Sequence, residues 1–521
     1  NTTEFLAIAS SIVPHRIAII FEGHKLTFQQ IQKRVDSLTN ALGDLGVKAG
    51  DRVAMMNLNT PEVIETYLAC AKMDAIFVPF NYRAKKAEFS HMIGISEPTV
   101  LFVGKRYENL VQSIIGNTTP PNYVVAVGQT SYPQWLSYNN LIESFSQEDI
   151  PLPSADDMDT TLLLFTAGTT GTPKAVMLSH NSFSSYMLSN VTPADPDIEE
   201  KNLLSVPMYH IAGIQGALAA IFGGRTLIIM RQFDALEWLK LVQNEGADRA
   251  AVVPTMLKQI MDHPKFREFD VSTLKTITYG AAPMPLGVIK RAIASFPSTR
   301  FINAFGQTET ASTITMLTPD DHILEGDPSE IEVKLRRLTS IGQPLGDIEV
   351  SIVDEDGKEM PPEHVGEIAT RGHRIMKGYW RDAKSTKDAI RGDWLYTGDL
   401  GYKDEDGYIY LAGRSKDFIK RGGEMISPEE VEQILMSHPY VDDAAIIGVP
   451  DIEWGERVRA IIVAVKGTST NSEQLIEYCH SRLASFKKPE SIVFVNELPR
   501  NALGKVLKRI LREKYSNPIH P

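Results

Sequence analysis

The stretch 162–178 constrains the fold more than any other part of the chain. It reads Leu-Leu-Leu-Phe-Thr-Ala-Gly-Thr-Thr-Gly-Thr-Pro-Lys-Ala-Val-Met-Leu, an apolar run, a Gly/Thr loop and a second apolar run. This pattern predicts two strands joined by a tight loop. Glycines let an anion approach the backbone N–H groups closely, and threonine hydroxyls and Lys174 add donors around it. We expect the loop to hold phosphate; an ordinary Gly/Thr hairpin turn is the alternative.

The loop resembles a P-loop but departs from that motif at two positions. A P-loop requires G-x-x-x-x-G-K-[ST] at the start of a helix. Gly168 and Lys174 keep the spacing, but Pro173 replaces the second Gly and Ala175 replaces the hydroxyl residue that binds the metal. Pro173 lacks a backbone donor, and the β-favouring Val176 continues a strand. The chain should therefore hold phosphate on a hairpin, outside the P-loop fold.

Composition excludes some classes of protein. The formal net charge of −12 over 521 residues argues against a general nucleic-acid binder, although a nucleotide ligand needs only local donors. The two cysteines, Cys70 and Cys479, have no metal-ligand spacing and fit a reducing, cytoplasmic setting. No signal peptide is visible at the N-terminus. The apolar stretch 210–230 is broken by glycines and Arg225, which predicts a buried helix followed by a core strand, with no membrane span.

The order of helical and strand patterns predicts an α/β fold. Up to about residue 340, helical periods such as that of Ile31, Val35, Leu38 and Leu42 alternate with buried strand patterns. Alternation of this kind predicts parallel sheets with helices on both faces, arranged here as two doubly wound α/β subdomains. Ligands of such sheets bind beyond the carboxyl ends of the strands. The strand pattern 276–283 ends there in small residues, which would let a flat ligand lie against the backbone.

The sequence pattern changes after residue 340. Short alternating strands separated by Asp-Gly turns predict a small β-barrel or distorted sheet that completes a large domain, residues 1–415. Residues 416–521 read as a smaller, mobile α+β domain. Its C-terminal cluster of basic residues is expected to be a solvated helix face. The cluster consists of Lys505, Lys508, Arg509, Arg512 and Lys514.

Several of these segments occur in the order found in one family. They are 165–174 (Phe-Thr-Ala-Gly-Thr-Thr-Gly-Thr-Pro-Lys), 305–309 (Phe-Gly-Gln-Thr-Glu), 396–400 (Tyr-Thr-Gly-Asp-Leu), 413–417 (Gly-Arg-Ser-Lys-Asp) and 499–505 (Pro-Arg-Asn-Ala-Leu-Gly-Lys). In this the chain resembles the adenylate-forming superfamily of acyl-CoA synthetases, luciferases and nonribosomal-peptide adenylation domains. The resemblance covers essentially the whole chain. It implies an AMP-forming acid–thiol ligase that uses ATP, Mg²⁺ and CoA.

The resemblance also implies roles for single residues. Glu309 would bind Mg²⁺, Thr308 would contact the α-phosphate, and Lys505 would bridge the substrate carboxylate and the α-phosphate. Phe305 would stack on adenine, and plain core packing is the alternative. The residues assigned to the phosphates are Thr166, Gly168, Thr169, Thr170, Gly171 and Lys174. Those assigned to the nucleoside are Gly280, Ala281, Ala282, Phe305 and Gly306, with Asp399 and Arg414 at the ribose.

A swing of the small domain is implied between the two half-reactions. Lys416 lies at the family's hinge position, and Gly422 and Gly423 would line the approach of the thiol. After adenylation, rotation at this hinge would remove Lys505 from the site. His210 would be either a mobile gate between the acid and thiol sites or a packed, hydrogen-bonded histidine.

The expected substrate class follows from the absence of an acidic side chain. Amino-acid-activating relatives carry an Asp near segment 208–211, and here that segment is Met-Tyr-His-Ile, so we expect an aryl or medium-chain acid without an α-amine. Two alternatives stay open: a ligase that loads a separate phosphopantetheinyl carrier protein, and a non-catalytic nucleotide-binding regulator. Small molecules are the expected partners, without nucleic acid, and a homodimer is left open.

Overall fold

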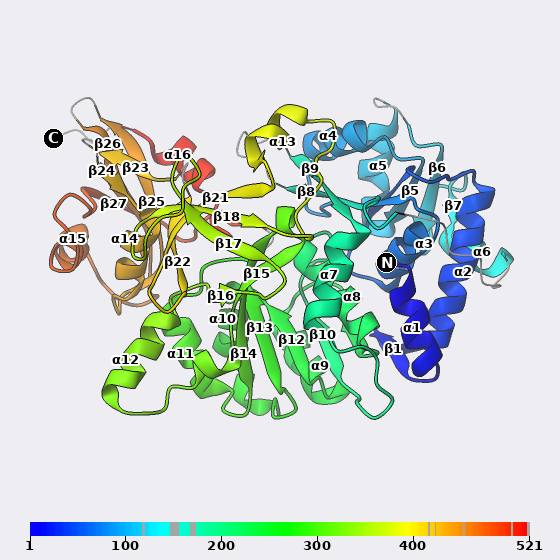
Figure 1. The fold of residues 1–521 in the computed structure, drawn as a ribbon, viewed down its shortest axis with the longest axis horizontal. Helices are drawn as coiled ribbons and strands as arrows, with labels where there is room; N and C mark the ends of the chain where they lie inside the picture. The colour runs from blue at the N-terminus through cyan, green and yellow to red at the C-terminus, as the bar shows by residue number, and fades with distance from the viewer. Residues whose placement is uncertain are drawn as a thin grey trace.

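A computed structural model describes residues 1–116, 120–145, 156–166, 173–414, 417–421, 424–451, 454–501 and 504–517. Figure 1 shows a large part made of two α/β layers and an antiparallel sheet, with a smaller lobe formed by the C-terminal residues. The fold confirms the predicted α/β class with a large N-terminal and a smaller C-terminal domain. The predicted joint at 415/416 lies outside the described residues and stays a prediction.

The first sheet carries the predicted hairpin at one edge. Its order is β19-β9-β8-β4-β3-β5-β6-β7, parallel from β8 to β7 and antiparallel at β8/β9 and β9/β19. The strands are β3 (Arg52–Met56), β4 (Ile76–Pro79), β5 (Val100–Gly104), β6 (Tyr123–Val127), β7 (Leu136–Ser137), β8 (Thr160–Thr166), β9 (Lys174–Ser179) and β19 (Gly378–Tyr379). The helices of this part are α1 (Glu4–Ile12), α2 (Phe28–Asp44), α3 (Pro61–Lys72), α4 (Lys86–Ser96), α5 (Glu108–Ile115), α6 (Tyr138–Ser144), α7 (His180–Asn190) and α13 (Ala383–Ala389).

The second sheet has the order β16-β15-β14-β13-β12-β10-β11-β1-β2. Its middle, from β14 to β1, is parallel, and antiparallel strands close both edges. The strands are β1 (Ile17–Phe21), β2 (His24–Thr27), β10 (Lys201–Leu204), β11 (Thr226–Ile229), β12 (Arg249–Val252), β13 (Thr276–Gly280), β14 (Arg300–Gln307), β15 (Ser312–Leu317) and β16 (Gln343–Pro344). The helices are α8 (Ile211–Phe222), α9 (Ala235–Glu245), α10 (Pro254–Asp262), α11 (Leu286–Ser295) and α12 (Pro328–Arg337).

Local sequence explains where these helices begin and what they bury. Thr27 caps α2 by accepting from the backbone N–H of Gln30, and the apolar period of α2 is buried as predicted. Ser179 caps α7 by accepting from the backbone N–H of Ser182. The predicted helix and core strand in 210–230 are α8 and β11. Among the described residues, every helix is too short or too polar to cross a bilayer.

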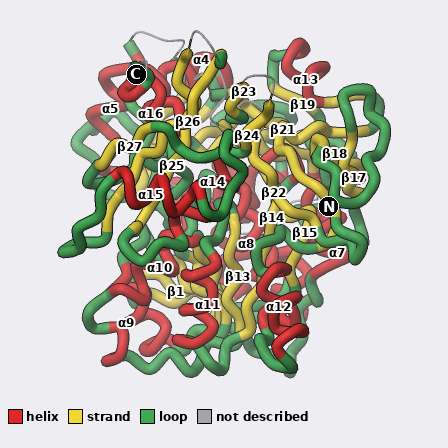
Figure 2. The backbone as a smooth tube through the Cα atoms, turned by 90° about the vertical axis from the view of Figure 1, so that its left-hand side faces the viewer, coloured by secondary structure: helices red, strands yellow, loops and turns green. Residues whose placement is uncertain are grey.

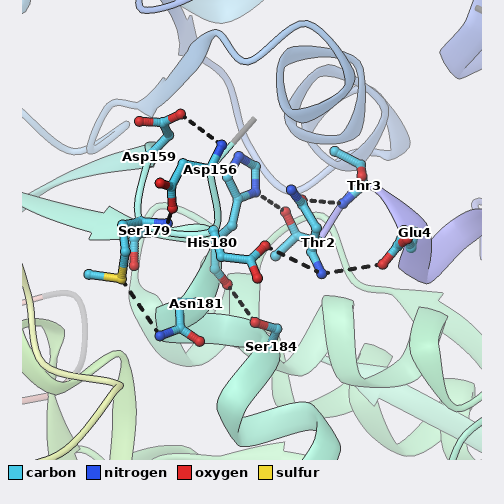
Figure 3. Close-up of polar contacts among 12 residues, drawn as sticks. Thr2, Thr3, Glu4, Asp156, Asp159, Ser179, His180, Asn181 and Ser184 are labelled. Carbon is cyan, nitrogen blue, oxygen red and sulfur yellow. Dashed lines mark hydrogen bonds and ion pairs between the residues drawn. The ribbon is translucent and has the colours of Figure 1, made fainter. Parts of the chain in front are cut away.

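The N-terminus is tied to the start of α7. The Thr2 hydroxyl lies 2.7 Å from Nδ1 of the buried His180 (Figure 3). The Asp159 carbonyl accepts from the His180 backbone N–H at 3.2 Å. Burial lowers the pKa of His180 to about 4. His180 is therefore a neutral hydrogen-bonding group that joins α7, the strand that follows the phosphate hairpin and the first residues of the chain.

An antiparallel half-barrel completes the large part, where short strands were predicted. Its order is β17-β18-β21-β20, with β22 on β21. The strands are β17 (Glu349–Val353), β18 (Gly366–Arg371), β20 (Ile390–Arg391), β21 (Trp394–Lys403) and β22 (Ile409–Arg414).

The small lobe has its own sheet, β24-β23-β26-β25 with β27 on β26. Alternate residues of β25 point to opposite faces: Ile446 packs with Val431, while Ile447 packs with Leu511. Helices therefore cover both faces of this sheet. The elements are β23 (Ile419–Arg421), β24 (Glu424–Ile426), α14 (Pro428–Met436), β25 (Val441–Asp451), β26 (Gly455–Ala464), α15 (Ser472–His480), β27 (Ser491–Phe494) and α16 (Lys508–Tyr515).

The basic C-terminal cluster departs in part from the solvated face that the sequence predicts. Arg509 and Lys514 of α16 are exposed, but Lys508 is only 11% exposed and its Nζ lies 2.8 Å from Glu432. Arg512 pairs with Asp417 at 2.7 Å. Two of the five residues in the cluster, Lys508 and Arg512, therefore fix α16 to the rest of the lobe.

Candidate active site

One cavity of about 2000 Å³ lies between the second sheet, the hairpin of the first sheet and the small lobe. Gly280, Thr308 and Lys174 line it from the large part, and Lys505 lines it from the small lobe. Figure 2 shows the small lobe, with α14 and β25, in front of the sheet and above α10 and α11. Four segments that are far apart in sequence thus meet at one cavity.

The hairpin places Lys174 at the cavity wall. β8 and β9 pair from Thr160/Ser179 to Thr166/Lys174, so Thr166 and Lys174 face each other where the loop begins and ends. The Lys174 Nζ donates to Ser385 Oγ at 2.6 Å and lies 5.0 Å from the centre of the Tyr379 ring. The predicted phosphate residues Gly168, Thr169, Thr170 and Gly171 lie outside the described residues.

The turn that carries Thr308 and Glu309 is held by Thr310. The Thr310 hydroxyl contacts the backbone of Gln307 and donates to the Ser312 carbonyl at 2.7 Å. A Cβ on Gly306 would lie 1.7 Å from the Ser312 carbonyl oxygen, so the close approach of β14 and β15 requires glycine there. This packing fixes the direction in which the turn presents its two polar residues to the cavity.

Tyr379 links the hairpin to Glu309. Its hydroxyl donates to Glu309 Oε1 at 3.0 Å, and its ring faces the Lys174 ammonium. Pairing of β19 with β9 sets Tyr379 opposite Val176, beside the exit of the phosphate loop. Among the described residues, no group of three His, Cys, Asp or Glu side chains forms a ready metal site. One carboxylate suits a Mg²⁺ ion that is held mainly by phosphate oxygens and water.

The small residues after β13 border the cavity as predicted, but the structure adds a second reason for Gly280. A Cβ there would lie 2.1 Å from the Ala304 carbonyl oxygen of the neighbouring strand. Ala281 and Ala282 also line the cavity, and Ala281 has a φ of +65°. The Phe305 ring packs against the half-barrel core around Ile368, while its neighbours Ala304 and Gly306 line the cavity. Stacking of Phe305 on adenine stays a prediction.

Asp399 and Arg414 face each other across the β21/β22 pair. Asp399 is buried, and its backbone N–H donates to the Thr397 hydroxyl at 3.1 Å. Gly398, with a φ of +75°, turns the strand at the cavity wall and donates to Glu367 at 2.9 Å. The two predicted ribose residues thus share one register position, although the Arg414 side chain lies outside the described atoms.

His210 stands at the start of α8 and lines the cavity. Its Nε2 is buried and has no hydrogen-bond partner among the described residues. Burial, reinforced by the Arg83 guanidinium, lowers the His210 pKa to about 3, so the ring is neutral at physiological pH. Both alternatives for this residue, a mobile gate and a packed histidine, stay predictions.

The small lobe brings Lys505 to the cavity through a tight loop. The Asn501 backbone N–H donates to the Lys505 carbonyl at 2.9 Å, and the Asn501 side chain accepts from the Lys505 N–H at 2.9 Å. An ion pair of 3.0 Å between Lys258 of α10 and Asp442 of β25 joins the lobe to the large part. The observed orientation thus places Lys505 at the same cavity as Thr308. Lys416, Gly422 and Gly423 lie outside the described residues.

Sequence reasoning missed several residues of this site. Tyr379 and Ser385 contact Glu309 and Lys174, and Thr255 of α10 contacts the loop of Lys505. Tyr379 belongs to a two-residue strand, too short for a periodic pattern. In the sequence, the preceding glycine is the one local sign of a special position, and in the structure this Gly378 has a φ of +138°.

Comparison with known proteins identifies relatives along the whole chain. The family described as AMP-binding enzyme matches residues 9–380, and the AMP-binding enzyme C-terminal domain matches residues 430–505. A fatty acid–[acyl-carrier-protein] ligase of Streptomyces coeruleorubidus is 32% identical over 99% of this chain and 96% of its own. A feruloyl-CoA synthase of Amycolatopsis sp. is 32% identical over 96% of each chain. The crystal structure of an anthranilate CoA ligase with anthranoyl-AMP superposes with a TM-score of 0.89 at 25% identity, covering 99% of this chain and 97% of that one.

Proposed function

The chain belongs to the family of AMP-binding enzymes, and from that premise we propose that it joins a carboxylic acid to the thiol of CoA, converting ATP to AMP and pyrophosphate. One observation carries the proposal: Lys505 of the small lobe and the Thr308–Glu309 turn of the large part line one cavity. The names of these three relatives agree in chemistry, because each describes the joining of an acid to a thiol acceptor.

In the first half-reaction, a carboxylate oxygen attacks the α-phosphorus of ATP, and the bond to pyrophosphate breaks. Both reacting groups are anionic, so the protein's main task is to position them and to offset charge. Lys505 bridges the carboxylate and the α-phosphate, and Thr308 donates to the α-phosphate. Thr166, Lys174 and the loop between them hold the β- and γ-phosphates.

Glu309 is the residue that would hold Mg²⁺. The ion, when bound, neutralises charge on the phosphate oxygens. Tyr379 donates to Glu309 Oε1. This hydrogen bond fixes the orientation of the whole carboxylate group, and with it the direction of Oε2. Asp399 and Arg414 contact the ribose, and Phe305 with residues 280–282 binds adenine.

In the second half-reaction, the thiolate of CoA attacks the acyl carbon, and AMP leaves. The proposal assigns this step to a second orientation of the small lobe, reached by rotation near Lys416. Rotation withdraws Lys505 and brings residues 420–424 toward the site. His210 is neutral, and its Nε2 has no hydrogen-bond partner among the described residues, so the ring can turn aside without breaking a hydrogen bond at that nitrogen.

The acid is proposed to lack an α-amine, because segment 208–211 has no carboxylate to pair with one. An aryl or medium-chain acyl group fits the cavity. The buried, unpaired Cys70 and Cys479 support a cytoplasmic location. A homodimer is compatible with the proposal and is not required by it.

A panel of carboxylic acids tests the function. Without a thiol acceptor, we expect pyrophosphate to exchange into ATP only when a carboxylic acid is present. When CoA is added, we expect AMP to be released over many turnovers. Absence of exchange with every acid would favour a nucleotide-binding regulator. Faster transfer to a phosphopantetheinyl carrier protein than to CoA would favour the carrier-loading alternative, which the first relative's name describes.

A further inference from the structure

We propose that the acid carries an oxygen acceptor, a hydroxyl or a second carboxylate, at the end remote from its reacting carboxyl group, and that Arg249 binds this acceptor. The inference rests on the proposed function, because it takes the deep part of the cavity as the place of the acyl group. Lys505 faces the carboxyl ends of the strands of the second sheet. The cavity extends along the sheet to the amino ends of these strands, and this far end is polar.

The floor of the deep part is one face of the second sheet. In the register of the sheet, Thr278 lies beside Ala251 and Ile302. Asn202 lies beside Arg249, which is two residues before Ala251 and further from the end of the sheet where the adenylate would form. Side chains in register share a face of a parallel sheet. Arg249, Ala251 and Thr278 are half-buried, whereas the residues that follow each of them are buried, so the three share the face toward the cavity. From Val253 to Arg249 the floor extends about 13 Å at the rise of a parallel strand.

The roof is a stripe of small residues on α8. Ala212, Gly216 and Ala219 are half-buried within a helix whose other residues are buried, and all three line the cavity. A Cβ on Gly216 would meet only Leu204, at 3.9 Å. Gly213 differs, because a Cβ there would lie 2.3 Å from the Pro207 carbonyl oxygen. The space above the floor is thus left open along one face of α8, where an acyl group fits.

The far end carries more positive than negative charge. Glu200 pairs with Arg225 at 2.7 Å and with Arg249 at 3.4 Å, so one carboxylate faces two guanidinium groups. Both arginines line the cavity, and Arg249 makes the longer of the two contacts. Burial and the neighbouring Arg249 charge lower the Arg225 pKa, and Glu200 opposes this shift. An anionic or dipolar oxygen would complete this charge balance.

Two buried amide atoms on the wall of the deep part are unpaired within the described structure. Asn202 Oδ1 and Gln215 Nε2 have no hydrogen-bond partner among the described residues, and both residues line the cavity. Asn202 is on the floor beside Arg249, and Gln215 is on the roof, directly before Gly216 in α8. Buried polar groups are costly when unpaired, so an aliphatic end would be a poor occupant. A hydroxyl can satisfy an acceptor and a donor together, and a carboxylate can accept from Gln215 and Arg249.

Two matched pairs of acids test the inference: octanedioic against octanoic acid, and 4-hydroxycinnamic against cinnamic acid. In each pair only the far-end acceptor differs. We expect kcat/KM for AMP release with CoA to favour the acceptor-bearing member of at least one pair by about tenfold or more. Arg249→Met should reduce that preference to within about twofold while the apolar partner keeps its rate. Arg231→Met removes an exposed arginine that pairs with Glu22 at 2.6 Å and serves as the matched control.

The outcomes separate the two proposals. Normal turnover with no preference in either pair, or Arg249→Met that lowers only the thermal stability, overturns the far-end site and leaves the ligase function standing. Failure of every acid to release AMP overturns the function itself. If Arg249→Met does not fold, Gln215→Met takes its place. Its loss of the preference supports the site, and an unchanged preference overturns it.

Discussion

Gly504, one residue before Lys505, packs directly against Thr255 of α10. A Cβ at Gly504 would lie 2.4 Å from Thr255 Oγ1, and the Gly504 φ of +75° is in the left-handed region. Glycine therefore permits the small lobe to approach the large part closely enough to place Lys505 at the cavity.

Gly504→Ala should slow adenylation about tenfold or more, because the added methyl group prevents this approach. Pyrophosphate exchange measures the effect. Gly467→Ala is the matched control, since Gly467 has a φ of +80° with nothing within 4 Å of a built Cβ. Equal slowing in both variants would assign the effect to backbone strain and contradict contact with Thr255.

Tyr379→Phe should raise the Mg²⁺ concentration needed for half-maximal adenylation several-fold, because Glu309 loses the donor at 3.0 Å that orients it. Titration of the initial rate with Mg²⁺ measures this change. Tyr132→Phe removes a hydroxyl that donates to Asn109 at 3.0 Å away from the cavity and should leave the curve unchanged. A lower maximal rate with an unchanged Mg²⁺ midpoint would argue against an orienting role.

Lys505→Ala and Lys416→Pro should damage different half-reactions. Loss of the Lys505 ammonium should cost about 3–4 kcal/mol and slow adenylation by about two to three orders of magnitude, while sparing thioester formation from supplied acyl-adenylate. Proline at 416 should restrict the hinge and have the reverse effect. Separate assays of pyrophosphate exchange and thioester formation distinguish them. Similar loss of both half-reactions in each variant would rule out the swinging lobe.

His180 should make the fold sensitive to acid. Its pKa is lowered from 6.5 to about 4 by burial, so between these values the unfolded chain binds the additional proton. The free energy of unfolding should therefore fall as pH drops through this window, by about 1.4 kcal/mol per pH unit at most.

Denaturant unfolding at several pH values measures this slope. His180→Gln keeps a polar partner for the Thr2 hydroxyl and should flatten the slope. The exposed His15→Gln variant should follow the wild type. An unchanged slope in His180→Gln would mean that other groups govern the acid sensitivity.

The sequence by itself determined the elements and their class. Alternating helical and strand patterns and the two apolar strands on either side of the 166–174 loop are local features, and the structure has each of them. Local features suffice here because side-chain periodicity and backbone propensity act within a few residues. The ordered motifs also identified the family, which the comparison confirms. They gave the positions of Glu309 and Lys505 without giving their surroundings.

Only the tertiary structure decided what surrounds those residues. Tyr379 meets Glu309 through a two-residue strand, Thr255 meets Gly504 across two lobes, and Arg249 faces Asn202 through sheet register. Such contacts join residues that are remote in sequence, and no local periodicity encodes the register or the crossover that brings them together. The depth of the cavity and the charge at its far end arise in the same way. They follow from the packing of α8 over the second sheet, which exists only in the folded chain.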